Sequence, residues 1–194
     1  MIKNIDGKIL IICGPSGVGK STIVKLIKHK NKSIKIIPTI TTRKPRISDE
    51  KIQYFEFISK KKFQNLSSRN CFLEKNLYDN NYYGTLKDDF MEIVKNRELA
   101  LKEQDIITAK QIKKIFPNNV IIIFITSTLL EIKKRLILRH ENSSADIEKR
   151  LKIAKTELTN TKYADCIIEN PKNHPEIAVN TILKIINIIS KQLK

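Results

Sequence analysis

The chain has 194 residues, 41% of them hydrophobic, and a formal net charge of +17, which predicts one domain with a sizeable core. Its longest apolar runs, residues 9–13 and 120–125, are of strand length and exclude a membrane span. The three cysteines fit neither a metal-binding nor a disulfide spacing, and a strand is predicted within the first ten residues, which leaves no room for a signal peptide. We therefore expect a reducing, cytoplasmic compartment.

The positive charge raises the question of a nucleic-acid partner. Lysine, isoleucine and asparagine are abundant along the whole chain, so the charge reflects overall composition rather than a local basic patch. Most lysines fall on the polar faces of predicted helices, where they are solvated. We expect neither nucleic acid nor a membrane as a partner, although the charge would help to attract anionic nucleotides.

Strand-like and helix-like segments alternate, which predicts an α/β fold with a mainly parallel sheet. The predicted strands cover residues 8–13, 33–40, 53–59, 72–77, 81–85, 99–102, 120–126 and 165–169. The predicted helices cover residues 20–30, 86–96, 106–116, 129–139, 145–161 and 175–193. Residues 34–85 contain several short strands and are expected to form an inserted β-rich lobe.

The first predicted strand leads into a glycine-rich turn of the form G-x-x-x-x-G-K-[ST]. It reads Gly14-Pro15-Ser16-Gly17-Val18-Gly19-Lys20-Ser21. Glycines lack Cβ, so the backbone can wrap a phosphate and point its N–H groups inward. Lys20 is expected to contact the β- and γ-phosphates and Ser21 to ligate Mg²⁺, while the following helix adds the positive end of its dipole. The segment predicts a nucleoside triphosphate site.

A second group of polar residues lies downstream. Arg43 and Arg46 are three residues apart in the loop TTRKPR, where Pro45 stiffens the backbone, so they could clamp a second phosphate. Glu74 follows in FLE and Tyr83 in NNYYGT. A single glutamate is usually solvated and a tyrosine pair in a strand usually packs. Their combination in this order favours a second ligand site.

These segments together resemble the guanylate kinase family, the ATP:GMP phosphotransferases, over about residues 7–190. The matching motifs are GPSGVGKST, TTRKPR, FLE, NNYYGT and the arginine-rich RLILRH…EKRL. The resemblance implies a P-loop NTPase core (residues 1–33, 86–128 and 160–194), a GMP-binding lobe (34–85) and a helical lid (about 129–159). It also implies ATP and GMP as substrates, Mg²⁺, and a monomer or homodimer.

The resemblance assigns the GMP-binding residues. Arg43, Arg46 and Tyr83 match residues that hold the GMP phosphate, and Glu74 matches the carboxylate that accepts hydrogen bonds from guanine N1 and N2. Adenine has no such pair of donors, so Glu74 would discriminate between the bases. The remaining matches near the base are Thr39, Thr85 and Asp105.

The resemblance also assigns the ATP site and the lid. Residues 14–21, Thr22 and Asn170 match the ATP site, with Asn170 beside the adenine. Arg135, Arg139 and Arg150 match the arginines of the lid. Phosphoryl transfer requires positioning and charge stabilisation, so the residues expected to act in catalysis are Lys20, Arg43, Arg139 and Arg150.

Four positions depart from the family pattern. Glu103 replaces an aspartate but keeps the charge needed for a water-mediated contact with Mg²⁺. Thr108 replaces a glycine, and the lid sequence Arg139-His140-Glu141 replaces R-G-T. Phe55 replaces a tyrosine that contacts the GMP phosphate. The adjacent Tyr54 could take that role after a one-residue slip, which would require a bulge.

The sequence thus predicts an enzyme that transfers the γ-phosphate of ATP to GMP, giving GDP and ADP, in purine nucleotide metabolism and GMP recycling. Two other readings remain. A non-catalytic guanylate-kinase-like interaction module is disfavoured by the intact phosphate loop. A P-loop kinase acting on another small phosphorylated acceptor is disfavoured by Glu74, which a sugar would not need.

Overall fold

The computed structural model describes residues 6–45, 54–78, 80–138 and 143–193. Its larger sheet has five parallel strands in the order β2-β7-β1-β8-β9. These are β2 (Lys35–Ile36), β7 (Leu99–Glu103), β1 (Lys8–Cys13), β8 (Val120–Thr126) and β9 (Cys166–Glu169). The α/β class and the parallel sheet are therefore confirmed.

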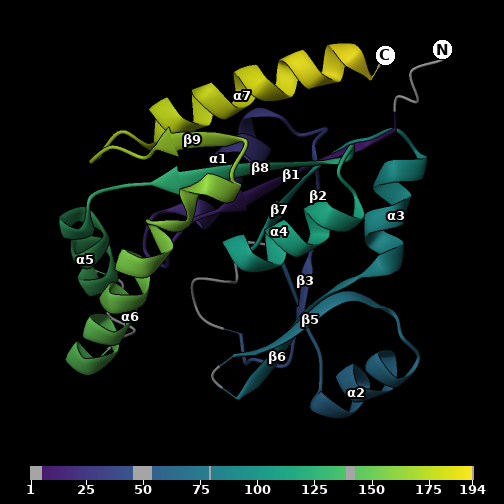
Figure 1. Ribbon diagram of the computed structural model, residues 1–194, viewed down its shortest axis with the longest axis horizontal. Helices are drawn as coiled ribbons and strands as arrows, with labels where there is room; N and C mark the ends of the chain where they lie inside the picture. The colour runs from purple at the N-terminus through teal and green to yellow at the C-terminus, as the bar shows by residue number, and fades with distance from the viewer. Residues whose placement is uncertain (1–5, 46–53, 79, 139–142, 194) are drawn as a thin grey trace.

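Helices cover both faces of this sheet (Figure 1). Side chains of β1 alternate between two buried clusters: Leu10 and Ile12 pack with α1 (Lys20–Lys30) and α7 (Pro175–Gln192), whereas Ile9 and Ile11 pack with α3 (Lys87–Lys95) and α4 (Ile106–Ile115). Burial on both faces explains why β1 is a continuous apolar run.

A second, smaller sheet lies apart from the first (Figure 1). Its four strands, in the order β4-β3-β6-β5, are β4 (Phe55–Phe57), β3 (Thr39–Thr41), β6 (Asn81–Leu86) and β5 (Phe72–Tyr78). Helix α2 (Lys60–Ser68) packs against it, with the Phe63 ring 4.4 Å from the Phe72 ring and 5.2 Å from the Tyr82 ring. The small buried cluster here contains Ile40, Phe63 and Phe72.

The predicted strand over residues 33–40 was wrong, because two strands occupy this stretch. Ile37 N still donates to Leu101 O at 2.9 Å in the large sheet, whereas Thr39 N donates to Tyr54 O at 2.8 Å in the small sheet. Pro38, between them, has no N–H to donate to either sheet. The chain passes from one sheet to the other at this proline.

Helix α2 is absent from the predicted elements. Its sequence KKKFQNLSS is mostly polar, and only Phe63 and Leu66 mark a buried side. Two sequence features could have predicted the helix. They are the spacing of three residues between Phe63 and Leu66, and the N-cap Ser59, whose side chain accepts from Lys62 N at 3.1 Å. The helix was missed because few of its residues are apolar.

The helix predicted over residues 145–161 ends early. Helix α6 (Ser144–Glu157) begins at a capping box formed by Ser143 and Asp146, and a separate 3₁₀-helix follows at Asn160–Tyr163. Helix α5 (Leu129–Leu138) agrees with its prediction as far as the described residues extend. The other predicted elements are confirmed, with small differences at their ends.

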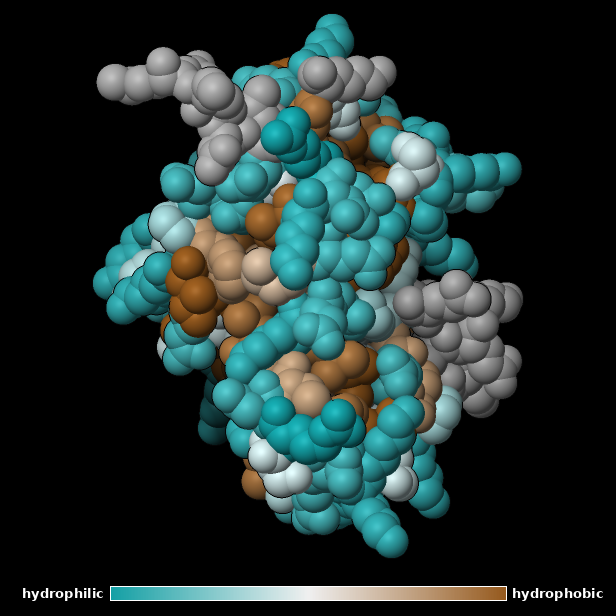
Figure 2. Space-filling model, turned by 90° about the vertical axis from the view of Figure 1, so that its right-hand side faces the viewer, coloured by the Kyte–Doolittle hydropathy of each residue, from teal (hydrophilic) through white to brown (hydrophobic). Residues whose placement is uncertain are grey.

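The surface is mostly polar. Figure 2 shows hydrophilic side chains over most of one face, with apolar atoms in smaller separate areas. Within the described ranges, no helix has the length and apolar character to cross a membrane. Cys13, Cys71 and Cys166 are free thiols.

Candidate active site

The phosphate-binding loop joins β1 to α1 at the carboxyl edge of the large sheet. Gly14, Gly17 and Gly19 have φ angles of 138°, 84° and 104°, which side chains rarely tolerate. A Cβ on Gly14 would lie 2.4 Å from Ile125 O, so this glycine is also required by close packing. Gly19 is the N-cap of α1, and no side chain in the described part of the protein caps it. The first N–H groups of α1 are therefore available to an anion.

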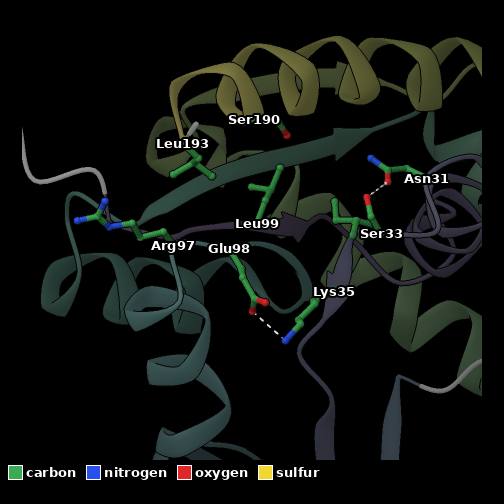
Figure 3. A pocket seen from close by; sticks show the side chains of 9 residues that line it. Asn31, Ser33, Lys35, Arg97, Glu98, Leu99, Ser190 and Leu193 are labelled. Atoms are coloured by element: carbon green, nitrogen blue, oxygen red, sulfur yellow. Dashed lines mark hydrogen bonds and ion pairs between the residues drawn. The ribbon is translucent and has the colours of Figure 1, made fainter.

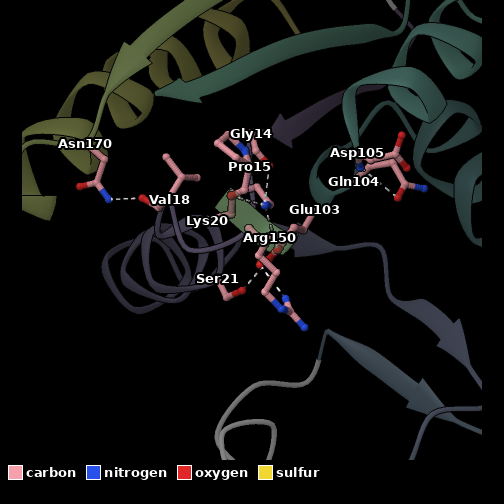
Figure 4. A network of polar contacts seen from close by, with 11 residues as sticks. Gly14, Pro15, Val18, Lys20, Ser21, Glu103, Gln104, Asp105, Arg150 and Asn170 are labelled. Atoms are coloured by element: carbon pink, nitrogen blue, oxygen red, sulfur yellow. Dashed lines mark hydrogen bonds and ion pairs between the residues drawn. The ribbon is translucent and has the colours of Figure 1, made fainter. Parts of the chain in front are cut away.

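Lys20, Ser21 and Glu103 meet at this loop (Figure 4). Lys20 Nζ donates to Gly14 O at 2.6 Å and to Pro15 O at 3.1 Å, and lies 4.0 Å from Glu103 Oε1. Ser21 Oγ donates to Glu103 Oε2 at 2.9 Å. The longer side chain of Glu103, where the family pattern has aspartate, thus reaches both loop residues.

The oxygens of Ser21 and Glu103 fit a magnesium site, because Mg²⁺ prefers hard oxygen ligands. Among the described residues there is no cluster of three or more acidic, histidine or cysteine side chains that could hold a metal ion. A Mg²⁺ ion here would take most of its ligands from phosphates and water, as is usual for this ion.

Helices α5 and α6 contact the loop through two arginines. Arg150 donates from one guanidinium nitrogen to Ser16 Oγ at 2.9 Å. Arg135 donates to the backbone oxygens of Val18 (2.8 Å), Asn170 (3.1 Å) and Pro171 (3.2 Å). Arg135 therefore ties α5 to the loop and to the end of β9. Arg139 lies outside the described residues, as do His140 and Glu141.

Asn170 lies beside Val18 of the loop (Figure 4). Its amide nitrogen donates to Val18 O at 2.7 Å, and a Cβ on Gly19 would lie 2.4 Å from that nitrogen. The buried Oδ1 of Asn170 has no hydrogen-bond partner in the described part of the chain. It is an available acceptor beside the phosphate-binding loop.

Glu74 is the buried carboxylate of the small sheet. Its Oε1 accepts from Thr85 Oγ1 at 2.6 Å and from Gln104 Nε2 at 2.8 Å, while its buried Oε2 has no partner among the described residues. Burial raises the pKa of Glu74, and the Thr85 hydrogen bond and the charge of Lys102 oppose this effect. A register shift between Phe72 and Glu74 interrupts the β5–β6 pairing at this point.

The glycine of NNYYGT is required by packing. A Cβ on Gly84 would lie 2.7 Å from Phe72 Cδ1 and 3.0 Å from Glu74 O. Tyr83, the preceding residue, pairs with Thr41 of β3 and with Asn76 of β5. Tyr83 is partly buried.

Arg43 lies over two aromatic rings. Its guanidinium carbon is 5.1 Å from the Phe55 ring centroid and 5.3 Å from the Phe57 ring centroid, and one nitrogen donates to Lys44 O at 2.9 Å. Phe55, which has no hydroxyl, therefore supports the arginine through its ring. Arg46 lies outside the described residues.

Tyr54 precedes β4 and is buried in the large hydrophobic cluster. Burial raises the pKa of Tyr54 to about 12, with a smaller contribution from the charge of Glu103. Thr39 pairs with Phe55 in a β3–β4 register that continues regularly to Phe57. The bulge that a slip of Tyr54 would require is not present in this pairing.

Residues 102–108, which run from the end of β7 into α4, include two contacts that the sequence did not predict. Gln104 donates to Glu74, and Lys102 is fully buried with its Nζ 3.2 Å from Thr39 Oγ1. Burial lowers the pKa of Lys102 to about 8, and the charges of Glu74, Asp89 and Glu103 oppose the shift. The presence of a lysine next to the apolar residues of LALKE was the sequence feature that could have indicated this buried position.

The other two residues of this segment have local roles. Asp105, expected near guanine, is the N-cap of α4 and accepts from Thr108 N at 2.9 Å. Thr108, which replaces a glycine of the family pattern, accepts from Asn76 Nδ2 at 2.9 Å through its hydroxyl. This threonine therefore connects α4 to β5.

A separate pocket of about 260 Å³ lies at the amino-terminal edge of the large sheet (Figure 3). Lys35 and Glu98 form an ion pair of 2.9 Å in its wall, and Arg97 and Ser190 also line it. None of the predicted nucleotide-binding residues belongs to its lining.

The large sheet and its glycine-rich loop, faced by a lysine, a serine and an acidic residue, define a P-loop nucleotide-binding protein. The family model described as guanylate kinase matches residues 6–187. The chain therefore belongs to the guanylate kinase family.

Individual relatives agree with this assignment. Guanylate kinase of Mycoplasma genitalium is 42% identical over 166 residues, covering 82% of this chain and 69% of the relative. Guanylate kinase of Clostridioides difficile is 40% identical, covering 84% and 80%. A crystal structure of guanylate kinase from Anaplasma phagocytophilum matches with a TM-score of 0.73 at 22% identity, over 97% of this chain and 87% of that one, and supports the fold.

Proposed function

We propose that this protein transfers the γ-phosphate of ATP to GMP and releases GDP and ADP. The observation that carries the proposal is the buried carboxylate of Glu74, whose Oε2 has no partner among the described residues, in a molecule that also has a complete phosphate-binding loop. Guanine presents N1–H and N2–H as adjacent donors, and an ionised carboxylate only accepts. Adenine, which has no such pair, would leave Glu74 unsatisfied.

Two adjacent residues, the last residue of β7 and the one after it, connect the two halves of the proposed site. Glu103 contacts Ser21 of the phosphate loop, and Gln104 contacts Glu74 of the small sheet. A base held by Glu74 is therefore anchored to the same strand end that meets the triphosphate loop. This connection supports a reaction between two nucleotides rather than binding of one.

The proposed reaction needs positioning and charge stabilisation more than a protein nucleophile. A phosphate oxygen of GMP forms a bond to the γ-phosphorus while the bond from that phosphorus to the β–γ bridging oxygen breaks, and the electron pair leaves with ADP. The acceptor phosphate is already anionic, so no general base is required. Ser21 and, through water, Glu103 would hold a Mg²⁺ ion, which supplies charge neutralisation at the β- and γ-phosphates.

We assign the remaining residues by the side of the site on which they lie. Lys20 and Arg150 would stabilise the transferring phosphate, with Arg139. Arg43 and Tyr83 would hold the GMP phosphate, with Arg46. Thr39, Thr85 and Asp105 would lie near guanine, and Asn170 near adenine. Tyr54 is the least supported of these assignments, because it is buried in the hydrophobic cluster.

The proposed division of the molecule follows the two sheets. The large sheet forms the core, the small sheet forms the GMP-binding lobe and α5–α6 form the lid. Because β2 pairs with β7, the lobe would begin after Pro38 rather than at residue 34. We further propose that the protein acts in the cytoplasm as a monomer or homodimer, without nucleic acid or a membrane.

A coupled assay of ADP formation tests this function. Purified protein with ATP and Mg²⁺ should form ADP with GMP and much less with AMP, CMP or UMP. The Lys20→Met variant should be strongly impaired and serves as the control for contaminating kinases. Absence of GMP-dependent ADP formation would contradict the proposal and favour a binding module. Turnover with a sugar phosphate instead of GMP would favour the other kinase class.

A further inference from the structure

Lys102 is a buried cation that the proposed reaction does not use. It lies on β7 next to Glu103, and its side chain is 0% exposed. Placing an ammonium group in a protein interior is costly unless donors and charges are matched. Ala100 and Leu101, the other buried residues of this strand, are apolar, so the fully buried lysine requires a specific explanation.

The ammonium of Lys102 reaches the point where the chain leaves the large sheet. Its Nζ donates to Thr39 Oγ1 at 3.2 Å and approaches Pro38 O at 3.4 Å. Pro38 separates β2, which pairs with β7, from β3, which belongs to the small sheet. Lys102, on the large sheet, thus contacts the residues through which the chain passes into the small sheet.

The charges that act on Lys102 come from three elements. They are Glu74 on β5, Asp89 on α3 and Glu103 on β7. Glu74 belongs to the proposed guanine site and Glu103 contacts the phosphate loop. One buried cation therefore interacts with a carboxylate from each half of the proposed active site.

We propose that Lys102 is a positioning residue for the acceptor nucleotide. Its hydrogen bonds hold Thr39 and the β2–β3 connection, so that the small sheet presents Glu74 towards the phosphate loop. This inference rests on the proposed function. A merely structural role makes a different prediction: removing the buried cation would lower the melting temperature without a selective change in the KM for GMP.

The test compares Lys102→Met with Lys95→Met, in which an exposed lysine of α3 receives the same replacement. In Lys102→Met we expect the KM for GMP to rise about tenfold or more, as for lost charged hydrogen bonds, and the KM for ATP to change less than about twofold. The melting temperature of the nucleotide-free protein is expected to fall because a buried cation is removed, but to stay above the assay temperature, so that the KM values are those of folded protein. Lys95→Met should leave all three quantities unchanged.

A double-mutant cycle with Thr39→Val tests the contact itself. If Lys102 acts through Thr39, the double variant should raise the KM for GMP by much less than the product of the two single effects. Three results would overturn the inference. They are equal rises in the KM for GMP and the KM for ATP, a lower melting temperature without a selective rise in the KM for GMP, and independent effects of the two substitutions. A wild-type protein that does not phosphorylate GMP would overturn the proposed function together with this inference, whereas GMP turnover that is insensitive to Lys102→Met would overturn the inference alone.

Discussion

The phosphate-binding loop and the small sheet form the two halves of the proposed site in different ways. The loop is one continuous segment, and the strand that precedes it is buried on both faces. Lys20 and Arg150 both donate hydrogen bonds to residues of the loop. The acceptor side combines single residues of β3 and β5, on the small sheet with its small buried cluster, with Lys102 of β7 on the large sheet. A local sequence motif is therefore enough to identify the phosphate-binding loop, whereas the residues of the acceptor side come together only when the chain folds.

This comparison predicts that the donor half controls turnover with every acceptor. Replacing Lys20 by methionine should lower kcat by roughly 10²–10³-fold, because a charge placed at the transferring phosphate is lost. Initial rates at saturating ATP and GMP measure the effect. An exposed lysine of α1, Lys25, gives the matched control as Lys25→Met. Near-normal kcat in Lys20→Met would contradict the assignment of the donor half.

The largest effect specific to the acceptor half is expected at Glu74. Glu74→Gln replaces one accepting oxygen by a donor that opposes the guanine donors, so kcat/KM for GMP should fall about 10²-fold. The KM for ATP should stay within about twofold, because the phosphate loop is untouched. Glu56→Gln, on the exposed side of β4, is the control in the same sheet. Equal losses for both nucleotides would mean that Glu74 does not read the base.

A smaller loss is expected at Arg43, which would contact the GMP phosphate. Arg43→Ala should raise the KM for GMP about tenfold, as for one lost charge-assisted contact, and raise the KM for ATP much less. Steady-state kinetics with each nucleotide varied in turn measure the two KM values separately. A parallel change in both KM values would refute the role of Arg43 and would weaken the separation between the halves.

The smallest effect concerns pH. Because burial raises the pKa of Glu74, this carboxylate takes up a proton at a higher pH than an exposed glutamate, and the protonated form cannot accept from both guanine donors. The KM for GMP should therefore rise as the pH falls through the raised pKa, by at most about tenfold per pH unit. Glu74→Gln should lose this dependence, while the titration of GMP itself affects both proteins equally. Identical pH profiles would contradict the prediction.

The same pKa shift acts on stability with the opposite sign. A carboxyl group whose pKa is raised by folding favours the folded state in its protonated form. The contribution of Glu74 to stability is therefore fully present below its ordinary pKa and is lost as the pH rises through the raised value. Through Glu74, a falling pH consequently weakens GMP binding but favours the folded state.

Most of the fold followed from local patterns. The continuous apolar run of β1 predicted burial on both faces, and the ends of α1, β8 and α7 agree closely with the predicted ranges. Helix α2 was missed because most of its residues are polar, and the strand predicted across Pro38 was wrong because apolar periodicity continues where the sheet changes. Periodicity reports which residues are apolar, not which sheet a strand joins.

By itself, the sequence determined the phosphate-binding loop, the parallel α/β core and the order of the acceptor motifs, because each depends on neighbouring residues. Only the tertiary structure revealed that Gln104 bonds to Glu74, that Phe55 supports Arg43 with its ring, and that Lys102 is buried against the β2–β3 connection. These contacts join separate segments of the chain. Their chemistry depends on burial and distance, which are set by the packing of the two sheets and not by any local pattern.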